Sequence, residues 1–106
     1  MSKQYEQKVL SYLHNFREVA KLVKEIIKKI DPEAHVYVFG SVVTQRFTGA
    51  SDIDILVITK NIDRKYDMMV EVYRSTDAPV ELHIVTPKLF EKWYRRFIND
   101  KELIEI

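Results

Sequence analysis

The sequence predicts an α/β (α+β) sandwich, in which a small mixed β-sheet is flanked by helices and preceded by a long N-terminal helix. Three observations carry this prediction. The chain has 106 residues, its apolar content of 46% suits one modest core, and helical and strand-like segments alternate along it. No repeat, low-complexity stretch or linker interrupts that order, so we expect residues 1–106 to form a single domain.

Composition excludes several classes of protein. The net charge is +1 although 31% of residues are charged, so charge alone indicates no nucleic-acid partner. Without cysteine, neither a disulfide framework nor a thiolate metal site is possible. The polar start MSKQYEQK has no apolar signal core, and no apolar run reaches membrane-spanning length. We therefore expect a cytoplasmic protein.

Residues 3–30 predict one long amphipathic helix, because they contain neither glycine nor proline. Apolar residues recur at alternating spacings of four and three: Val9, Leu13, Phe16, Ala20, Val23, Ile27 and Ile30. The helix would be roughly 40 Å long at 1.5 Å per residue and would end at Asp31-Pro32. Its apolar stripe can pack on the chain's own sheet. A helix this long overhangs a small domain, so contact with a partner or a second copy is the alternative.

The remaining elements follow in order. Residues 35–39 predict a strand, and Gly40-Ser41 opens a short turn or helix that runs to about Arg46. Residues 52–59 predict a second strand, and residues 63–75 a helix with one apolar face. That face consists of Tyr66, Met69, Val70 and Tyr73.

The last third of the chain predicts a strand and a helix. Residues 80–85 read as the third strand, and Thr86-Pro87 forms a favourable N-cap and first-turn pair for the final helix. Helical spacing places Leu89, Phe90, Trp93, Tyr94 and Phe97 toward the core.

Asp52 and Asp54 are the first candidate site residues. Residues two apart on a strand share a face, with Cα atoms ~6.5 Å apart. Two carboxylates so close repel each other unless a cation lies between them, and oxygen ligands suit Mg²⁺ or Mn²⁺. The alternative is a pair of ordinary solvated acids at the start of a strand.

Gly40-Ser41 forms the second candidate. Backbone N–H groups at the start of a helix can bind phosphate, glycine allows close approach, and the Ser41 hydroxyl can donate or cap. The chain has two glycines, Gly40 and Gly49, where average usage of ~7% gives about seven, so we expect both where backbone geometry requires them. A plain structural cap is the alternative reading. Arg46, Thr48 and Ser51 could add contacts to a triphosphate.

The segment from Phe39-Gly40-Ser41 through Ser51-Asp52-Ile53-Asp54-Ile55-Leu56-Val57 resembles the signature of the DNA polymerase beta-type nucleotidyltransferase superfamily. With the closing Glu81-Leu82-His83-Ile84-Val85-Thr86-Pro87, it looks like the minimal nucleotidyltransferase branch. The resemblance spans about residues 35–99. It implies that Asp52 and Asp54 bind catalytic metal, that Gly40 and Ser41 hold the nucleotide phosphates, and that a neighbouring strand supplies a third acid.

The third acid departs from the usual pattern. Counting back from Thr86-Pro87 places it on His83, whereas Glu81 lies two residues earlier on the same face. We favour Glu81 as metal ligand and general base, because oxygen suits Mg²⁺ better than imidazole does. His83 could orient Glu81 or touch phosphate. A polar strand edge is the alternative for both residues.

The resemblance further implies transfer of a nucleoside monophosphate, AMP from ATP, to a hydroxyl. It also implies a small helical partner of the HEPN type, which some minimal nucleotidyltransferases modify as antitoxins. Two other classes compete: a catalytically degenerate module that acts by contact, and a single-strand nucleic-acid binder. The second rests on basic residues among aromatic ones at Lys88, Lys92, Arg95 and Arg96. Helical spacing separates these bases from the aromatic face, so we expect no nucleic-acid partner.

Overall fold

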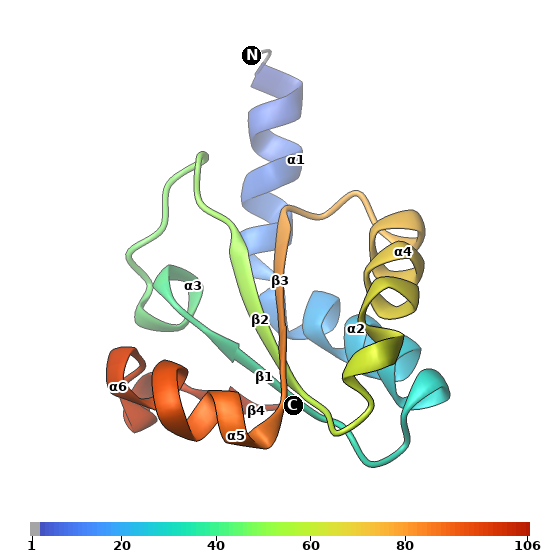
Figure 1. Cartoon of the computed structure of the whole chain (residues 1–106). Coiled ribbons are helices and arrows are strands. Elements are labelled where there is room, and N and C mark those ends of the chain that lie inside the picture. The colour runs from blue at the N-terminus through green and yellow to red at the C-terminus, as the bar shows by residue number, and fades with distance from the viewer. Residues whose placement is uncertain (1–2) are drawn as a thin grey trace.

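A computed structural model describes residues 3–106 and contains a four-stranded mixed sheet with the strand order β3-β2-β1-β4 (Figure 1). The strands are β1 (His35–Phe39), β2 (Ile53–Ile58), β3 (Val80–Val85) and β4 (Ile104–Glu105). β2 runs parallel to β3, whereas β1 is antiparallel to both β2 and β4. The predicted α+β class and its three main strands are therefore confirmed, and β4 is an addition that the sequence did not predict.

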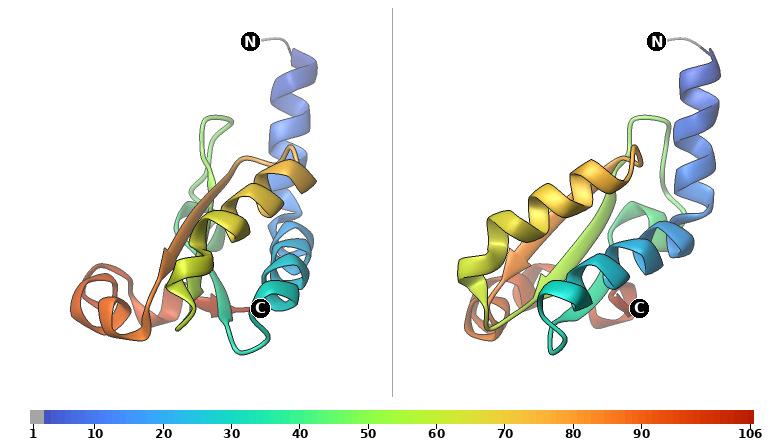
Figure 2. Two further views of the ribbon diagram at one scale, coloured as in Figure 1. Left: turned by 45° about the vertical axis from the view of Figure 1, so that its right-hand side comes forward. Right: turned by 90° about the vertical axis from the view of Figure 1, so that its right-hand side faces the viewer.

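The N-terminal segment forms two helices, α1 (Lys3–His14) and α2 (Phe16–Ile30), so the prediction of one continuous helix is wrong. Asn15 separates them with φ −103° and ψ 32°. Its side-chain amide donates to the carbonyl of Ser11 at 2.9 Å. Asparagine is disfavoured inside helices because its side chain bonds to nearby backbone groups in this way, and the break falls at this residue. α1 consequently projects away from the sheet, while α2 lies along it (Figure 2).

The principal core lies between one face of the sheet and the helices α2 and α4 (Lys65–Ser75). It contains strand residues Val36, Val38, Ile53, Ile55, Val57, Val80, Leu82 and Ile84, and helix residues Leu13, Val23, Ile27, Met68 and Val72. The apolar stripe of the N-terminal segment thus packs largely on the chain's own sheet, the first of its two predicted readings.

Of the apolar face predicted for the helix after β2, Met69 is partly buried against the core, whereas the prediction is wrong for the other three residues. Met68 and Val72 are the buried residues of α4, whereas Tyr66, Val70 and Tyr73 are exposed. A 3-10 turn, η1 (Ile62–Arg64), precedes α4. The helix is apolar on more than one side, and spacing alone did not tell which side meets the sheet.

The C-terminal segment covers the opposite face of the sheet. It comprises α5 (Pro87–Leu89), a π-helical turn η2 (Phe90–Tyr94), α6 (Arg95–Phe97) and the 3-10 turn η3 (Asp100–Glu102). The predicted cap is confirmed, since the Thr86 hydroxyl accepts from the Leu89 N–H at 3.2 Å. Only part of the predicted core face is buried: Phe90 packs with Leu56, Ile58 and Val85, whereas Leu89, Trp93 and Phe97 are exposed.

The pairing of β1 with β4 sets the surroundings of His35 and Tyr37. β4 brings Glu105 to His35, whose Nδ1 lies 2.8 Å from Oε2. Burial, with a smaller contribution from Glu105, raises the pKa of the Tyr37 phenol. Within residues 3–106, no helix is long and apolar enough to cross a membrane.

Candidate active site

Asp54 lies in the middle of a row that crosses three adjacent strands. It pairs with Phe39 on β1 and with Glu81 on the parallel strand β3. Its neighbours Ile53 and Ile55 are fully buried, so alternation turns the carboxylate to the opposite face of the sheet. Glu81 and His83 share that face because Leu82 and Ile84 point into the core, as predicted. Strand pairing therefore brings residues from two strands to one place.

Asp54, Glu81 and His83 form one compact cluster, with a potential ligand atom from each lying within 4.8 Å of the others. Nε2 of His83 lies 3.5 Å from Oδ1 of Asp54 and 3.8 Å from Oε1 of Glu81. The side chains of Asp54 and His83 are 23% exposed and that of Glu81 is 56% exposed. The cluster is thus open to solvent from the Glu81 side and sheltered on the other.

Gly40 closes the sheltered side of the cluster. Its φ is +85°, in the region that only glycine adopts freely, and a Cβ atom at this position would overlap Oδ2 of Asp54. The carboxylate therefore rests directly against the backbone at the end of β1. Gly49 differs, because a Cβ there would meet nothing within 4 Å. The prediction that both glycines are required by the backbone holds only for Gly40.

Ser41 begins the short helix α3 (Ser41–Thr44), which Gly40 caps. The Gly40 carbonyl accepts from the N–H groups of Val43 and Thr44 at 3.1 and 3.3 Å. Gln45 ends α3 in the left-handed conformation with φ 62°. A strand, a glycine turn and a short helix are therefore present, as the sequence predicts, although the helix has only four residues.

The loop between α3 and β2 places the other sequence-predicted residues. The Ser51 hydroxyl accepts from the Thr48 N–H at 2.9 Å, and the Ser51 N–H donates to the Thr48 carbonyl at 3.0 Å, so both residues close the loop. Arg46 is exposed. Asp52 is exposed and lies one residue before β2, outside the cluster that contains Asp54. The structure thus brings Gly40, Asp54 and Glu81 together, and Asp52 lies beside them on the loop.

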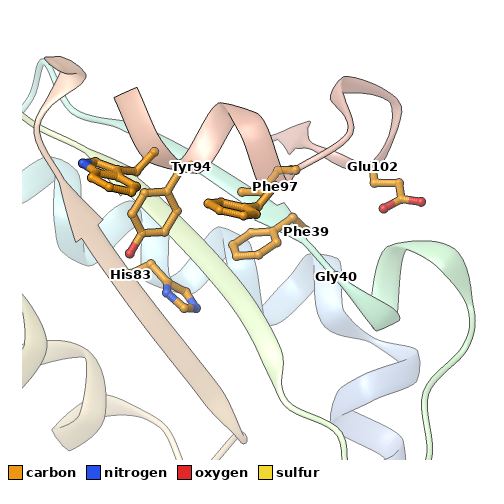
Figure 3. A pocket seen from close by; sticks show the side chains of 8 residues that line it. Phe39, Gly40, His83, Tyr94, Phe97 and Glu102 are labelled. Carbon is orange, nitrogen blue, oxygen red and sulfur yellow. The ribbon is translucent and has the colours of Figure 1, made fainter. Parts of the chain in front are cut away.

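A pocket of about 440 Å³ adjoins the cluster, and we call it the aromatic pocket. It is lined by Phe39, Gly40, His83, Trp93, Tyr94, Phe97, Ile98 and Glu102. His83 links it to the acids: its ring centroid lies 5.3 Å from that of Phe39 and 6.1 Å from that of Tyr94. In Figure 3 the rings of Tyr94, Phe97 and Phe39 gather on one side of His83. The sequence did not predict this pocket, because the spacing of Trp93, Tyr94 and Phe97 indicated core positions.

The cluster is chemically suited to a divalent cation. Asp54 and Glu81 offer carboxylate oxygens, the ligands preferred by Mg²⁺ and Mn²⁺, and a cation would offset their mutual repulsion. His83 offers a nitrogen, which could bind a softer cation or donate a hydrogen bond to a coordinating carboxylate. The donor set therefore fits a metal without selecting one.

Comparison with known proteins identifies the class of protein. Residues 20–106 match the family model of the nucleotidyltransferase domain. A crystal structure of a protein assigned to the nucleotidyltransferases is similar over 81% of this chain and 95% of that one, with 31% identity and a TM-score of 0.65. A second crystal structure, of a protein from Sulfolobus solfataricus, is similar over 99% of this chain and 87% of that one, with 23% identity and a TM-score of 0.59. This similarity shows that the two proteins share the fold. No curated protein matches.

The chain belongs to the nucleotidyltransferase domain family. It is accordingly a transferase whose substrate is a nucleotide, and its size and elements fit the minimal nucleotidyltransferases. Members of this family generally use divalent metal ions, in keeping with the Asp54–Glu81–His83 cluster.

Proposed function

We propose that this protein transfers AMP from ATP to a hydroxyl group on a partner protein, as an antitoxin-like minimal nucleotidyltransferase. The observation that supports it most strongly is that Asp54 contacts Gly40 on one side and pairs with Glu81 on the other. A glycine turn therefore lies next to two acids on parallel strands. A phosphate-binding turn beside a metal-binding pair is the minimum that nucleotidyl transfer requires.

In this proposal each residue of the site has a defined task. Asp52, Asp54 and Glu81 hold Mg²⁺ or Mn²⁺, which when bound would offset the charge on the triphosphate and lower the pKa of the acceptor hydroxyl. Gly40 and Ser41 hold phosphate oxygens through N–H groups and the Ser41 hydroxyl, with help from Arg46 and Ser51. Asp52 lies on the loop beside the cluster, so its role in this proposal rests on the family pattern.

In the proposed reaction, the α-phosphorus of ATP exchanges one bond to oxygen for another. The acceptor oxygen forms a bond to the α-phosphorus of ATP, and the bond from that phosphorus to the α,β-bridging oxygen breaks. Pyrophosphate leaves with the electron pair of the broken bond. The acceptor's proton passes to the carboxylate of Glu81, which is 56% exposed and thus reachable from solvent.

A protein partner is supported by the surface of the molecule. α1 projects beyond the sheet in both views of Figure 2. The exposed side of α4 carries Tyr66, Val70 and Tyr73, which are 76%, 58% and 46% exposed. Apolar surface of this kind marks contact sites. We propose a small helical partner of the HEPN type, and a homodimer through the N-terminal helices as a further assembly.

The nucleotide site is tested by calorimetric titration with α,β-methylene-ATP, in which the bond broken in the reaction is blocked. We expect binding in Mg²⁺ and loss of at least tenfold in affinity in EDTA. Asp54→Asn should cause a similar loss because the metal loses a charged ligand. Asp63→Asn is the matched control, since Asp63 is an exposed acid on η1.

Equal affinity in Mg²⁺, in EDTA and in Asp54→Asn would refute metal-dependent binding at this cluster. Transfer is then followed with α-labelled ATP and the helical partner. Binding without transfer would favour the competing class, a degenerate module that acts on its partner by contact alone. The resemblance noted in the sequence places the third acid at His83, and this departure from the family pattern is the feature that favours the second class.

A further inference from the structure

We propose that the aromatic pocket holds the base of the bound nucleotide by ring stacking, with Phe97 and Trp93 as its principal contacts. This inference rests on the proposed nucleotide site and adds to it the part of the ligand that the phosphate turn and the acids leave unplaced.

The position of the pocket is the first support. Gly40 belongs both to the phosphate turn and to the pocket wall, and His83 belongs both to the acid cluster and to the pocket wall. The three parts of the site are therefore contiguous. A ligand whose phosphates lie on Gly40-Ser41 and whose metal lies on Asp54 and Glu81 has its remaining end beside this pocket.

The chemistry of the lining is the second support. Phe97 is 80% exposed and Trp93 is 54% exposed, although both are large apolar side chains. A ligand that covers exposed apolar side chains removes them from water, which makes binding more favourable. A nucleobase is a flat aromatic ring, and aromatic side chains stack on it with little dependence on which base it is.

The backbone of the C-terminal segment is the third support. Phe90–Tyr94 forms a π-helical turn between α5 and α6, a rare form that is frequently found at functional sites. Phe90 is buried under this turn, whereas Trp93, Tyr94 and Phe97 reach the pocket. One segment thus anchors itself with one aromatic ring and presents three others to the site.

The exposed stripe on α4 offers an instructive contrast. Tyr66 is 76% exposed and Phe97 80%, yet Tyr66 lies on α4, on the face of the sheet opposite the acids, and does not line the aromatic pocket. Exposure alone therefore does not mark the base site. Continuity with Gly40 and His83 distinguishes the aromatic pocket from other apolar surface.

The chain contains a single tryptophan, so intrinsic fluorescence reports on this pocket directly. We would titrate the full chain in Mg²⁺ with α,β-methylene-ATP and, separately, with inorganic tripolyphosphate. Tripolyphosphate shares the phosphate chemistry and lacks the base. We expect the nucleotide to quench Trp93 and tripolyphosphate to bind without quenching.

Phe97→Ala separates the base from the phosphates. We expect it to weaken nucleotide binding by about tenfold or more, the usual loss for one stacked base, and to leave tripolyphosphate binding unchanged. The matched control is Tyr66→Ala, which removes an equally exposed aromatic ring from α4. Circular dichroism checks that both variants fold. We expect both to fold because the replaced side chains are exposed.

Each outcome decides the question. Quenching by the nucleotide alone, together with a selective loss in Phe97→Ala, supports the base site. Nucleotide and tripolyphosphate binding alike, without quenching and without an effect of Phe97→Ala, overturns the base site and leaves the phosphate and metal sites standing. Binding of neither ligand overturns the proposed nucleotide site and this inference together.

Discussion

At the scale of single residues, the contact between Gly40 and Asp54 governs the site. Gly40 has a positive φ, and it leaves room for an oxygen of Asp54 where any side chain would collide. The carboxylate in turn lies within reach of His83 on the next strand. Glycine is therefore needed here for two reasons at once, backbone conformation and space.

Replacing Gly40 by alanine should disrupt both stability and ligand binding. The new Cβ strains the backbone and displaces Asp54, so we expect about 1–3 kcal/mol of destabilisation and loss of metal-dependent nucleotide binding. Urea unfolding and calorimetry measure the two effects. Gly49→Ala is the control, because the space around Gly49 is open and its backbone is ordinary, and its free energy of unfolding should barely change.

At the scale of elements, the C-terminal segment depends on how its first turn begins. Thr86 caps the turn through its hydroxyl, and Pro87 occupies a position where its missing N–H costs nothing. The same cap fixes the direction in which the chain leaves β3. Since Trp93, Tyr94 and Phe97 follow within the next turns, the cap also sets where the pocket wall stands.

Thr86→Ala should therefore lower the free energy of unfolding by about 1 kcal/mol, the usual cost of a lost cap. Thermal and urea unfolding give this value. Lys88→Ala, an exposed change in the same turn, is the comparison and should be nearly neutral. Equal stability of the two variants would show that the Thr86 hydroxyl contributes nothing to the segment.

At the scale of the whole molecule, one buried polar contact joins the end of α2 to the end of β2. The hydroxyl of Thr59 donates to Oδ2 of Asp31 at 2.5 Å, and the two residues are 2% and 3% exposed. Asp31 also accepts from the Glu33 N–H, and Thr59 accepts from the Asn61 N–H. Two loops distant in sequence are thus held together at the edge of the core.

Thr59→Val keeps the shape of the side chain and removes its hydroxyl. Asp31 then loses a buried donor, so we expect about 1–3 kcal/mol of destabilisation. Thr59→Ser retains the hydroxyl and should recover most of that loss, which urea unfolding would reveal. The reverse order, with serine less stable than valine, would contradict a role for the hydrogen bond.

Much of this fold could be predicted from patterns along the chain. β-branched runs predicted three strands within a residue or two of their bounds, and Thr86-Pro87 predicted a helix start. Period-two alternation also placed Glu81 and His83 on one face. These features are local, because each depends on residues a few positions apart.

The features that could not be predicted depend on distant parts of the chain. The break at Asn15 is a local exception, because its side chain donates to a carbonyl only four residues away. α4, in contrast, is apolar on more than one side, so the sheet decides which side is buried. The spacing of the aromatic residues after Pro87 indicated that all of them are buried. Spacing does not reveal how much sheet surface is available, and in the structure the sheet buries only some of them. Asp52 shares the motif of Asp54 but begins outside the strand that orients its neighbour.

The parallel pairing of β2 with β3 has a consequence for the order in which the protein acquires its site. Asp54 and Glu81 become neighbours only when the crossover through α4 is complete, and a slip of one residue would turn Glu81 and His83 into the core. β3 is also one of the two edge strands of the sheet, so within the sheet it is held by β2 alone. The acid cluster therefore exists only while β3 is paired with β2, and fraying of β3 would separate Asp54 from Glu81 and His83 while β1 and β2 stay paired.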